Sequence, residues 1–254
     1  MDQHGERSPV MLITGGSRGI GAATALLAAR AGYDVAFSYN SDLAAAEEVA
    51  AGVRATGQRC FFRACDVGDE QQIVDLFEAT DSQLGTPAAV VVNAGILFER
   101  SRVEDLSVSR IERVLTVNVI GAFVTCREAV RRMATDYGGS GGAIVVLSSA
   151  AARLGSPNEF VDYAASKGAT DSLIIGLAKE TATRGIRVNG VRPGLIHTDI
   201  HLDAGVADRI GELIGGVPMG RGGTADETAA PVLWLCSDEA SYITGTIVDV
   251  TGGR

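Results

Sequence analysis

Seven short apolar runs recur along the chain from residue 10 onward, and longer amphipathic stretches separate them. The runs are continuous rather than alternating, which is typical of strands that are buried on both faces of a parallel sheet. They occupy residues 10–14, 34–39, 60–64, 88–93, 143–149, 186–191 and 245–250. The pattern therefore predicts seven strands.

The stretches between the runs are predicted to be helices. They cover residues 19–31, 43–56, 69–84, 108–137, 161–183 and 224–237. Thr224 and Glu227 have the spacing of a capping box, which predicts where the last helix begins. Regular alternation of strand and helix favours parallel pairing with right-handed crossovers. We therefore expect an α/β fold, a Rossmann-type doubly wound parallel sheet of about seven strands with helices on both faces.

A single domain accounts for the whole pattern, because no internal repeat or shift in composition marks a boundary. We expect a disordered N-terminal tail over residues 1–9 and one dinucleotide-binding domain over residues 10–254. The stretch 193–223 is too long for an ordinary connection. Part of it, around residues 195–216, is predicted to form a partly helical substrate lid.

Composition narrows the class of protein. The 254 residues are 46% hydrophobic, a proportion that argues against a disordered chain. A net charge of −9 disfavours a nucleic acid or an anionic membrane as the partner. Neither a secretory signal nor a membrane-spanning stretch is visible in the sequence, so we expect a cytoplasmic protein. The four cysteines are scattered, and we expect them to be reduced, buried side chains.

A glycine-rich turn joins the first strand to the first helix. It reads Thr14-Gly15-Gly16-Ser17-Arg18-Gly19-Ile20-Gly21, and we call it the phosphate loop. In such a turn bare backbone can approach a pyrophosphate, and the helix N-terminus supplies N–H donors and a favourable dipole. Glycines at this spacing can also form a tight turn that binds nothing. Their position at the first strand and first helix of an alternating chain favours a dinucleotide site.

The end of the second strand bears on which dinucleotide is bound. An acidic side chain at this point holds the ribose 2′-hydroxyl of NAD and would repel the 2′-phosphate of NADP. Here the strand ends in Tyr39, Asn40 and Ser41, which offer neutral donors. Arg18 in the phosphate loop supplies a cation. We therefore predict NADP(H) as the cofactor in preference to NAD(H).

A tyrosine and a lysine, Tyr163 and Lys167, lie four residues apart on one face of a predicted helix. An unperturbed tyrosine has a pKa near 10, and a nearby ammonium group is expected to lower that pKa. Ser148 and Ser149 end a central strand, at the edge where open α/β sheets bind ligands. A tyrosine and a lysine at this spacing can also be a solvated pair. The serines beside them favour a catalytic site.

Together these motifs resemble those of the short-chain dehydrogenase/reductase family, and the resemblance extends over essentially the whole chain from Val10. Single-domain members similar to 3-oxoacyl-acyl carrier protein reductases and glucose 1-dehydrogenases are the nearest in pattern. The motifs are the phosphate loop, Asn93-Ala94-Gly95 after the fourth strand, Asn118, Ser149, the pair Tyr163 and Lys167, and Pro193-Gly194 after the sixth strand.

The resemblance implies an NADP-dependent oxidoreductase that transfers hydride between the nicotinamide and a carbonyl or secondary alcohol. Tyr163 would be the general acid and base, and Lys167 would lower its pKa and bind the ribose. Ser149 would polarise the carbonyl, and Asn118 would anchor a water that relays protons. The implied cofactor contacts are Gly15, Ser17, Arg18, Gly19, Ile20, Gly21, Tyr39, Asn40, Ser41, Asp66, Val67, Asn93, Ala94, Gly95, Tyr163, Lys167, Pro193, Gly194, Ile196 and Thr198.

Three features depart from common members of that family. Only one asparagine precedes Ala94, where two are common. Two adjacent serines compete for one role, and we assign it to Ser149 because this residue lies six positions before Gly155. The loop 156–160 makes the serine-to-tyrosine spacing one residue longer than in ketoacyl-reductase-like members. Because that loop borders the substrate, the difference argues against carrying over a ketoacyl substrate.

Several alternatives follow from the same residues. His197 and His201 are four apart, but no third ligand lies at a metalloenzyme spacing, so we expect no metal and leave open a substrate-facing role for one of them. The resemblance also implies a homotetramer, or a homodimer, packed through the long helix and the tyrosine-bearing helix. A dinucleotide sensor without turnover, an NAD-preferring sugar or alcohol dehydrogenase and a methyltransferase are the competing functions. Tyr163 and Lys167 favour the oxidoreductase.

Overall fold

The computed structural model describes residues 8–198, 205 and 208–254, and in it seven parallel strands form one sheet in the order β3-β2-β1-β4-β5-β6-β7. The strands are β1 (Val10–Ile13), β2 (Asp34–Tyr39), β3 (Cys60–Ala64), β4 (Ala89–Val92), β5 (Gly142–Leu147), β6 (Ile186–Pro193) and β7 (Ile247–Val250). The order reverses between β1 and β4, where doubly wound sheets open a crevice for ligands. The predicted fold class is confirmed.

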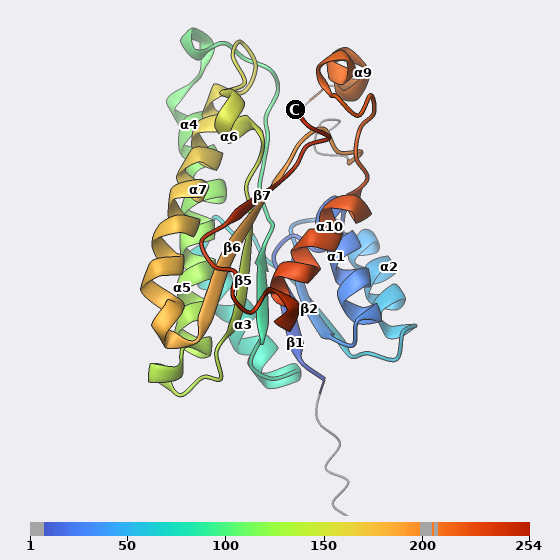
Figure 1. Cartoon of the computed structure of the whole chain (residues 1–254), viewed down its shortest axis with the longest axis vertical. Helices are drawn as coiled ribbons and strands as arrows, with labels where there is room; N and C mark the ends of the chain where they lie inside the picture. The colour runs from blue at the N-terminus through green and yellow to red at the C-terminus, as the bar shows by residue number, and fades with distance from the viewer. Residues whose placement is uncertain (1–7, 199–204, 206–207) are drawn as a thin grey trace, which may run out of the picture.

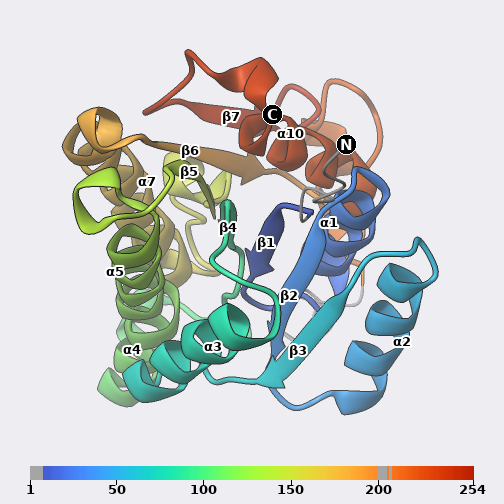
Figure 2. The ribbon, with the colours of Figure 1, turned by 90° about the horizontal axis from the view of Figure 1, so that it is seen from below.

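Helices cover both faces of this sheet (Figures 1 and 2). One layer contains α1 (Gly19–Arg30), α2 (Leu43–Arg54) and α10 (Ala225–Cys236), and the other contains α3 (Glu70–Gln83), α4 (Val108–Leu115), α5 (Gly121–Met133) and α7 (Val161–Thr181). Neighbouring strand residues serve opposite layers, since Leu12 belongs to the core under the second layer and Ile13 to the core under the first. This double burial explains the continuous apolar runs in the sequence.

The two edge strands differ from the prediction of burial on both faces. Residues of β3 are half-buried or exposed, and those of β7 are mostly half-buried. An edge strand has a neighbour on one side only, so its flank stays open to solvent. The apolar runs of β3 and β7 therefore indicate strands correctly but overstate their burial.

The helix predicted over residues 108–137 is present over residues 108–133, with a π turn inside it and an earlier end. A π-helical turn over Thr116–Ile120 separates α4 from α5, and α5 ends at Met133 because Ala134 leaves the helical region with ψ 135°. A π turn holds one residue more than an α turn and often occurs at functional sites. It contains Asn118, one of the predicted site residues.

The described part of the stretch after β6 contains one short α-helix. Ile196 forms an isolated bridge with Gly223, and α9 (Arg209–Leu213) lies above the carboxyl ends of the strands (Figure 1). Residues 199–204 and 206–207 of the predicted lid, His201 among them, lie outside the described residues, as do residues 1–7 of the predicted tail. All four cysteines are free thiols. Among the described residues no helix is long and apolar enough to cross a membrane.

Candidate active site

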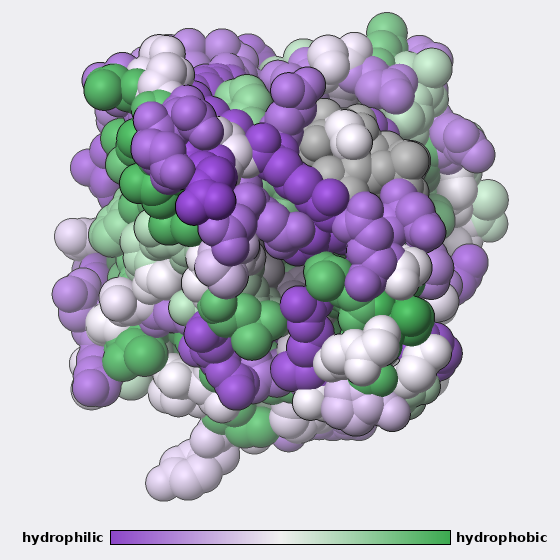
Figure 3. Space-filling model, turned by 90° about the horizontal axis from the view of Figure 1, so that it is seen from above, coloured by the Kyte–Doolittle hydropathy of each residue, from purple (hydrophilic) through white to green (hydrophobic). Residues whose placement is uncertain are grey.

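A cavity of about 730 Å³ opens at the carboxyl ends of the strands. Its lining comes from the segments that follow β1 to β6, and from α4, α6 (Ala151–Leu154), α7 and α9. Figure 3 looks onto this end of the molecule, where the surface is hollowed between mostly hydrophilic residues. The predicted phosphate loop contributes to this lining, as do three of the four predicted catalytic residues: Tyr163 and Lys167 on α7, and Ser149 after β5.

The phosphate loop has a backbone that only glycine adopts readily. Gly15 and Gly19 have φ angles of +68° and +53°, in the left-handed region that disfavours side chains. A Cβ on Gly21 would lie 2.1 Å from the carbonyl oxygen of Gly15, so the first turn of α1 can close over the loop only without a side chain there. The loop therefore presents bare backbone to the cavity.

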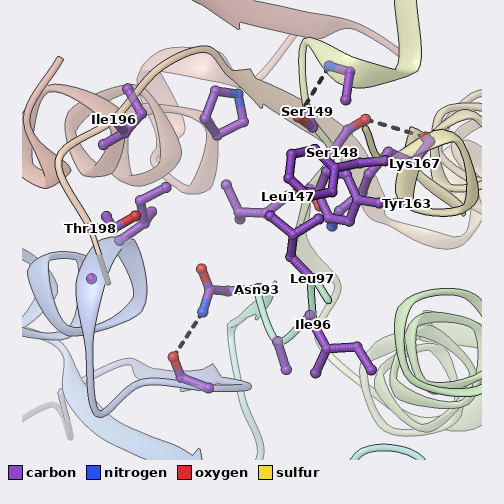
Figure 4. Close-up of a pocket in the computed structure, with 18 of the residues that line it drawn as sticks. Asn93, Ile96, Leu97, Leu147, Ser148, Ser149, Tyr163, Lys167, Ile196 and Thr198 are labelled. Atoms are coloured by element: carbon purple, nitrogen blue, oxygen red, sulfur yellow. Dashed lines mark hydrogen bonds between the residues drawn. The ribbon is translucent and has the colours of Figure 1, made fainter. Parts of the chain in front are cut away.

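Two strands brace this loop. The backbone N–H of Gly15 donates to the Ser38 hydroxyl at 2.9 Å. The side-chain Nδ2 of Asn93 donates to the carbonyl oxygens of Thr14 and Gly15 at 3.0 and 2.8 Å. Figure 4 shows this side chain at the cavity. The Thr14 hydroxyl accepts in turn from the backbone N–H groups of Asn93 and Ala94. A single asparagine thus ties β4 to the loop.

The cavity wall contains an ion pair that the sequence did not reveal. Asp66 accepts from the backbone N–H of Gly68 at 2.9 Å and from the Arg113 guanidinium at 2.8 Å. Both Asp66 and Arg113 line the cavity. Arg113 comes from α4, and its nearness to the end of β3 depends on how that helix packs.

Lys167 is buried, with only 5% of its surface exposed. Its ammonium donates to the carbonyl oxygen of Leu147 at 2.7 Å and lies 5.7 Å from the ring centroid of Tyr163 (Figure 4). Burial lowers the pKa of Lys167 from 10.5 to about 8, although the carboxylate of Asp171 opposes that change. At neutral pH most of the molecules still carry the charge.

The expected lowering of the tyrosine pKa is not found. Burial raises the pKa of Tyr163 above its ordinary value, and a hydrogen bond with Ser149 opposes this only in part. The Lys167 ammonium points to the carbonyl of Leu147 instead of the phenol oxygen, so desolvation dominates. Tyr163 is therefore a protonated phenol at neutral pH.

The two adjacent serines have different surroundings. Ser148 is buried, and its hydroxyl donates to Asp171 at 2.5 Å. Asp171 also accepts from the Arg192 guanidinium at 3.0 Å, so the carboxylate ties the ends of β5 and β6 to α7. Ser148 is thus part of the scaffold.

Ser149 is half-buried at the cavity wall. Its hydroxyl oxygen accepts from the backbone N–H of Ala151 at 3.1 Å, and its side chain lies beside Tyr163 (Figure 4). These contacts favour the assignment of the catalytic role to Ser149.

Asn118 does not line the cavity, and it is 1% exposed. Its side-chain oxygen accepts from the backbone N–H of Ile96 at 2.8 Å, and its nitrogen donates to the Ile96 carbonyl and to the Ser166 hydroxyl at 3.0 and 3.1 Å. The side chain therefore clamps the segment after β4 to α7. Both of its N–H donors are occupied, so the predicted water relay would need another group of this residue.

Most of the predicted cofactor residues meet at this cavity. Those that line it are Gly15, Ser17, Arg18, Gly19, Ile20, Tyr39, Asn40, Asp66, Val67, Asn93, Ala94, Gly95, Tyr163, Lys167, Pro193, Gly194, Ile196 and Thr198. Gly21 and Ser41 are not among the lining residues; Gly21 is packed beneath the loop, and Ser41 is exposed. His197 lies against Gly222, and among the described residues no cluster of three metal-ligating side chains occurs.

The remaining wall is mostly apolar and comes from segments distant in sequence. Leu97, Leu154, Phe160, Leu195 and Leu213 line it. An ion pair between Glu159 and Arg209 completes this end of the cavity. The sequence marked the loop 156–160 as a border of the substrate, but no sequence signal pointed to Arg209.

Comparison with known proteins agrees with this geometry. A family model described as enoyl-(acyl carrier protein) reductase matches residues 15–254. The chain is 53% identical over 245 residues to an uncharacterised oxidoreductase, YgfF, of Escherichia coli (strain K12), with 96% of this chain and 99% of that protein covered.

Two solved structures illustrate the similarity of fold. A short chain dehydrogenase from Burkholderia cenocepacia J2315 in complex with NADP has a TM-score of 0.88 and 33% identity, with 97% of this chain and 98% of that chain covered. A 3-ketoacyl-(acyl-carrier-protein) reductase from Brucella melitensis complexed with NADH has a TM-score of 0.88 and 30% identity, with 98% of each chain covered. The chain therefore belongs to the short-chain dehydrogenase/reductase family and is an oxidoreductase.

Proposed function

We propose that this protein is an NADP-dependent oxidoreductase that interconverts a small-molecule carbonyl and the corresponding secondary alcohol. The observation that carries the proposal is the position of Tyr163, Ser149 and Lys167 in one cavity with the phosphate loop. The test is to follow NADPH oxidation by its near-ultraviolet absorbance against a panel of aldehydes, ketones, diketones and oxidised sugars. Absence of turnover with every carbonyl class would contradict the proposal.

The residues present fit a nicotinamide dinucleotide. The phosphate loop offers bare backbone at the N-terminus of α1, which suits a pyrophosphate. The cofactor residues named above as lining the cavity would hold the rest of the molecule. When bound, the dinucleotide supplies or accepts the hydride.

The chain's own residues supply the proton and the polarisation. The phenol of Tyr163, which burial keeps protonated, is placed to donate to a carbonyl oxygen. The Ser149 hydroxyl is a second donor for the same oxygen, so the two would stabilise the charge that develops there. Lys167 holds a positive charge beside the Tyr163 ring, which favours the phenolate after the proton has left.

The preference for NADP rests on the end of β2. Tyr39 and Asn40 line the cavity together with Arg18, which is exposed at the start of α1. The nearest acid, Asp42, is engaged elsewhere, because its carboxylate accepts from the backbone N–H of Ala45 and caps α2. In the segment between β2 and α2, no acidic residue lines the cavity, so none there would repel a 2′-phosphate.

Replacing Arg18 with alanine is expected to weaken NADPH binding about 10- to 100-fold, because a charge-assisted hydrogen bond to phosphate contributes about 1.5 to 3 kcal/mol. NADH binding should change far less. Fluorescence titration with both cofactors measures the two dissociation constants. Arg30→Ala, in the last turn of the same helix, is the control. Equal losses for NADPH and NADH in Arg18→Ala would contradict the NADP assignment.

The serine assignment can be tested with a matched pair. Ser149→Ala is expected to lower kcat about 100-fold through loss of a donor to the carbonyl oxygen. Ser148→Ala removes a hydroxyl bonded to Asp171, so it should lower the free energy of unfolding by about 1 kcal/mol. Its loss of kcat should be much smaller than that of Ser149→Ala. Steady-state kinetics and urea unfolding of both variants check this. A larger loss of kcat in Ser148→Ala would reverse the assignment.

We also propose that the protein forms a homotetramer, or a homodimer, through the layer that contains α5 and α7. Large apolar side chains are exposed on this layer and on the turn before α5. They are Leu115, Ile120, Phe123 and Ile175. Exposed apolar patches on the faces of helices are typical of subunit contacts. The same helices contain Tyr163 and Lys167, so association would support the site.

A further inference from the structure

An ion pair adjoins the candidate active site, where the ends of β5 and β6 meet α7. Asp171 of α7 and Arg192 of β6 pair at 2.9 Å, and their side chains are only 14% and 16% exposed. Neither residue lines the cavity. Any effect of this pair on the reaction is therefore transmitted through neighbouring residues that do line it.

The Asp171 carboxylate joins α7 to the end of β5. Its Oδ1 accepts from the hydroxyl of Ser148 at 2.5 Å, and Ser148 immediately precedes Ser149. One turn earlier on α7, the Lys167 ammonium donates to the carbonyl oxygen of Leu147 at 2.7 Å. Figure 4 shows Leu147, Ser148 and Lys167 close together. Two charged side chains of α7 thus bind successive residues at the same strand end.

The other oxygen of Asp171 joins α7 to the end of β6. Its Oδ2 accepts from Nε of Arg192 at 3.0 Å. Arg192 immediately precedes Pro193 and Gly194, which line the cavity. A second carboxylate also holds this guanidinium, because Nη1 lies 3.5 Å from Asp249 of β7. One aspartate therefore connects two strand ends that contribute to the site.

The charge of Asp171 also acts on the ammonium of Lys167, where it opposes the lowering of the pKa by burial. The ammonium otherwise faces uncharged groups. They are the ring of Tyr163 on the same helix, the carbonyl at the end of β5, and Gly95 in the segment after β4. Arg192 brings a second positive charge to this region, and Asp171 is the carboxylate that compensates it.

We infer that Asp171 is a positioning residue for the proposed reaction, one that fixes the ends of β5 and β6 to α7 and so holds Ser149 and the Lys167 ammonium in place without touching substrate or cofactor. The inference rests on the proposed function and deepens it. A carboxylate suits this role because its two oxygens serve different strands and its charge offsets that of Arg192. An amide has one acceptor oxygen and no charge.

Lysine NMR gives a readout that does not depend on turnover, because the chain has only two lysines, Lys167 and Lys179. Both are isotopically labelled at Cε, and their signals are followed against pH; Lys167→Met identifies which signal is which. In Asp171→Asn the Lys167 signal should titrate about one pH unit lower than in the unaltered protein, because a nearby negative charge is lost. The exposed Lys179 is the internal control.

Arg192→Gln breaks the same pair from the other side and separates the effect of charge from that of the fold. Loss of the cation leaves Asp171 uncompensated, so the Lys167 signal should titrate at a higher pH than in the unaltered protein. A pair that served the fold alone would change Lys167 in the same direction in both variants. Asp34→Asn is the remote control, because Asp34 is a buried partner of Arg59 at the amino end of β2.

Steady-state kinetics measure the effect on the reaction. Asp171→Asn should lower kcat about 10- to 100-fold and change KM for the carbonyl substrate less than about threefold, because displaced catalytic groups slow the chemical step more than binding. Asp34→Asn should retain its original kcat and its original Lys167 titration. Urea unfolding of both variants confirms that the folded proteins are being compared.

The outcomes separate the two proposals. If the unaltered protein reduces no carbonyl, the proposed function fails even where the Lys167 titrations agree with the inference. If Asp171→Asn leaves the Lys167 titration unchanged, or loses no more kcat than Asp34→Asn, the role of Asp171 is overturned. If Asp171→Asn does not fold, Arg192→Gln decides, since a Lys167 signal that titrates at the same or a lower pH would contradict the inference.

Discussion

Replacing Tyr163 with phenylalanine is expected to lower kcat about 1,000-fold, because positioned proton transfer contributes roughly 10² to 10⁴ in rate. The phenol is the acidic group beside Ser149 at the cavity wall, and burial keeps it protonated at neutral pH. Phenylalanine preserves the ring that packs against Leu97 and Phe160, so the fold should be unaffected. Steady-state reduction of the best carbonyl substrate, with NADPH binding measured separately by fluorescence, checks both expectations.

Tyr242→Phe is the matched control for this variant, since Tyr242 is fully exposed. It should leave kcat and NADPH affinity at their original values. A Tyr163→Phe protein that retains more than about a tenth of the original kcat would mean that another group supplies the proton. A large loss of NADPH affinity in the same variant would instead indicate a role in cofactor binding.

Lys167→Met should lower activity nearly as much as Tyr163→Phe. It should also change how the free energy of unfolding varies with pH. The ammonium lies beside the Tyr163 ring and inside the cavity, so its loss removes both a positive charge at the reacting centre and a donor toward the cofactor. We expect kcat/KM to fall about 1,000-fold. If Lys167 binds the cofactor ribose as proposed, NADPH affinity should fall as well, in contrast to Tyr163→Phe.

The stability effect follows from the lowered pKa. Lys167 has a pKa of about 8 in the folded protein, against an ordinary value of 10.5. Between these values the unfolded chain binds more protons at this site than the folded protein, so this lysine makes the free energy of unfolding rise with pH. The rise between pH 7.5 and 10 should be about 2 kcal/mol for this group. The Lys167→Met variant should lack this rise in the free energy of unfolding.

The measurement is urea unfolding of both proteins across that pH range. Cysteines and tyrosines also titrate there, but they are common to both chains, so the difference between unaltered protein and variant isolates Lys167. Lys179→Met is the control, because Lys179 is the other lysine of α7 and is exposed. A difference in unfolding free energy that stays constant with pH would show that the ammonium is not desolvated in the folded protein.

Elements whose signal is local could be predicted from the sequence. The phosphate loop is such a case, since glycines at fixed spacing are required by its own φ angles and by the contact between Gly21 and Gly15. The start of α10 is another, because Thr224 and Glu227 cap the helix within one turn. Tyr163 and Lys167 share a face because they are four apart on one helix.

The π turn between α4 and α5 could not be predicted in this way. The apolar pattern is compatible with one long helix, and the π turn at residues 116–120 depends on Asn118 reaching Ile96 and Ser166. These partners are 22 and 48 residues away in the chain. The predicted lowering of the Tyr163 pKa was wrong for a related reason. The change in this pKa depends on burial and on where the Lys167 ammonium points.

The sequence by itself determined the order of strands and helices along the chain, the glycine positions of the phosphate loop and the shared helix face of Tyr163 and Lys167, because each depends on spacing within one or two neighbouring elements. Only the tertiary structure decided which serine lies beside Tyr163 and which is bonded to Asp171, how Asn118 is used, and which charged side chains pair in the cavity wall. The pairs Asp66 and Arg113, 47 residues apart, and Glu159 and Arg209, 50 residues apart, form only when separate loops and helices pack over the sheet. Contacts at such separations carry no periodicity in the sequence, so packing alone determines them.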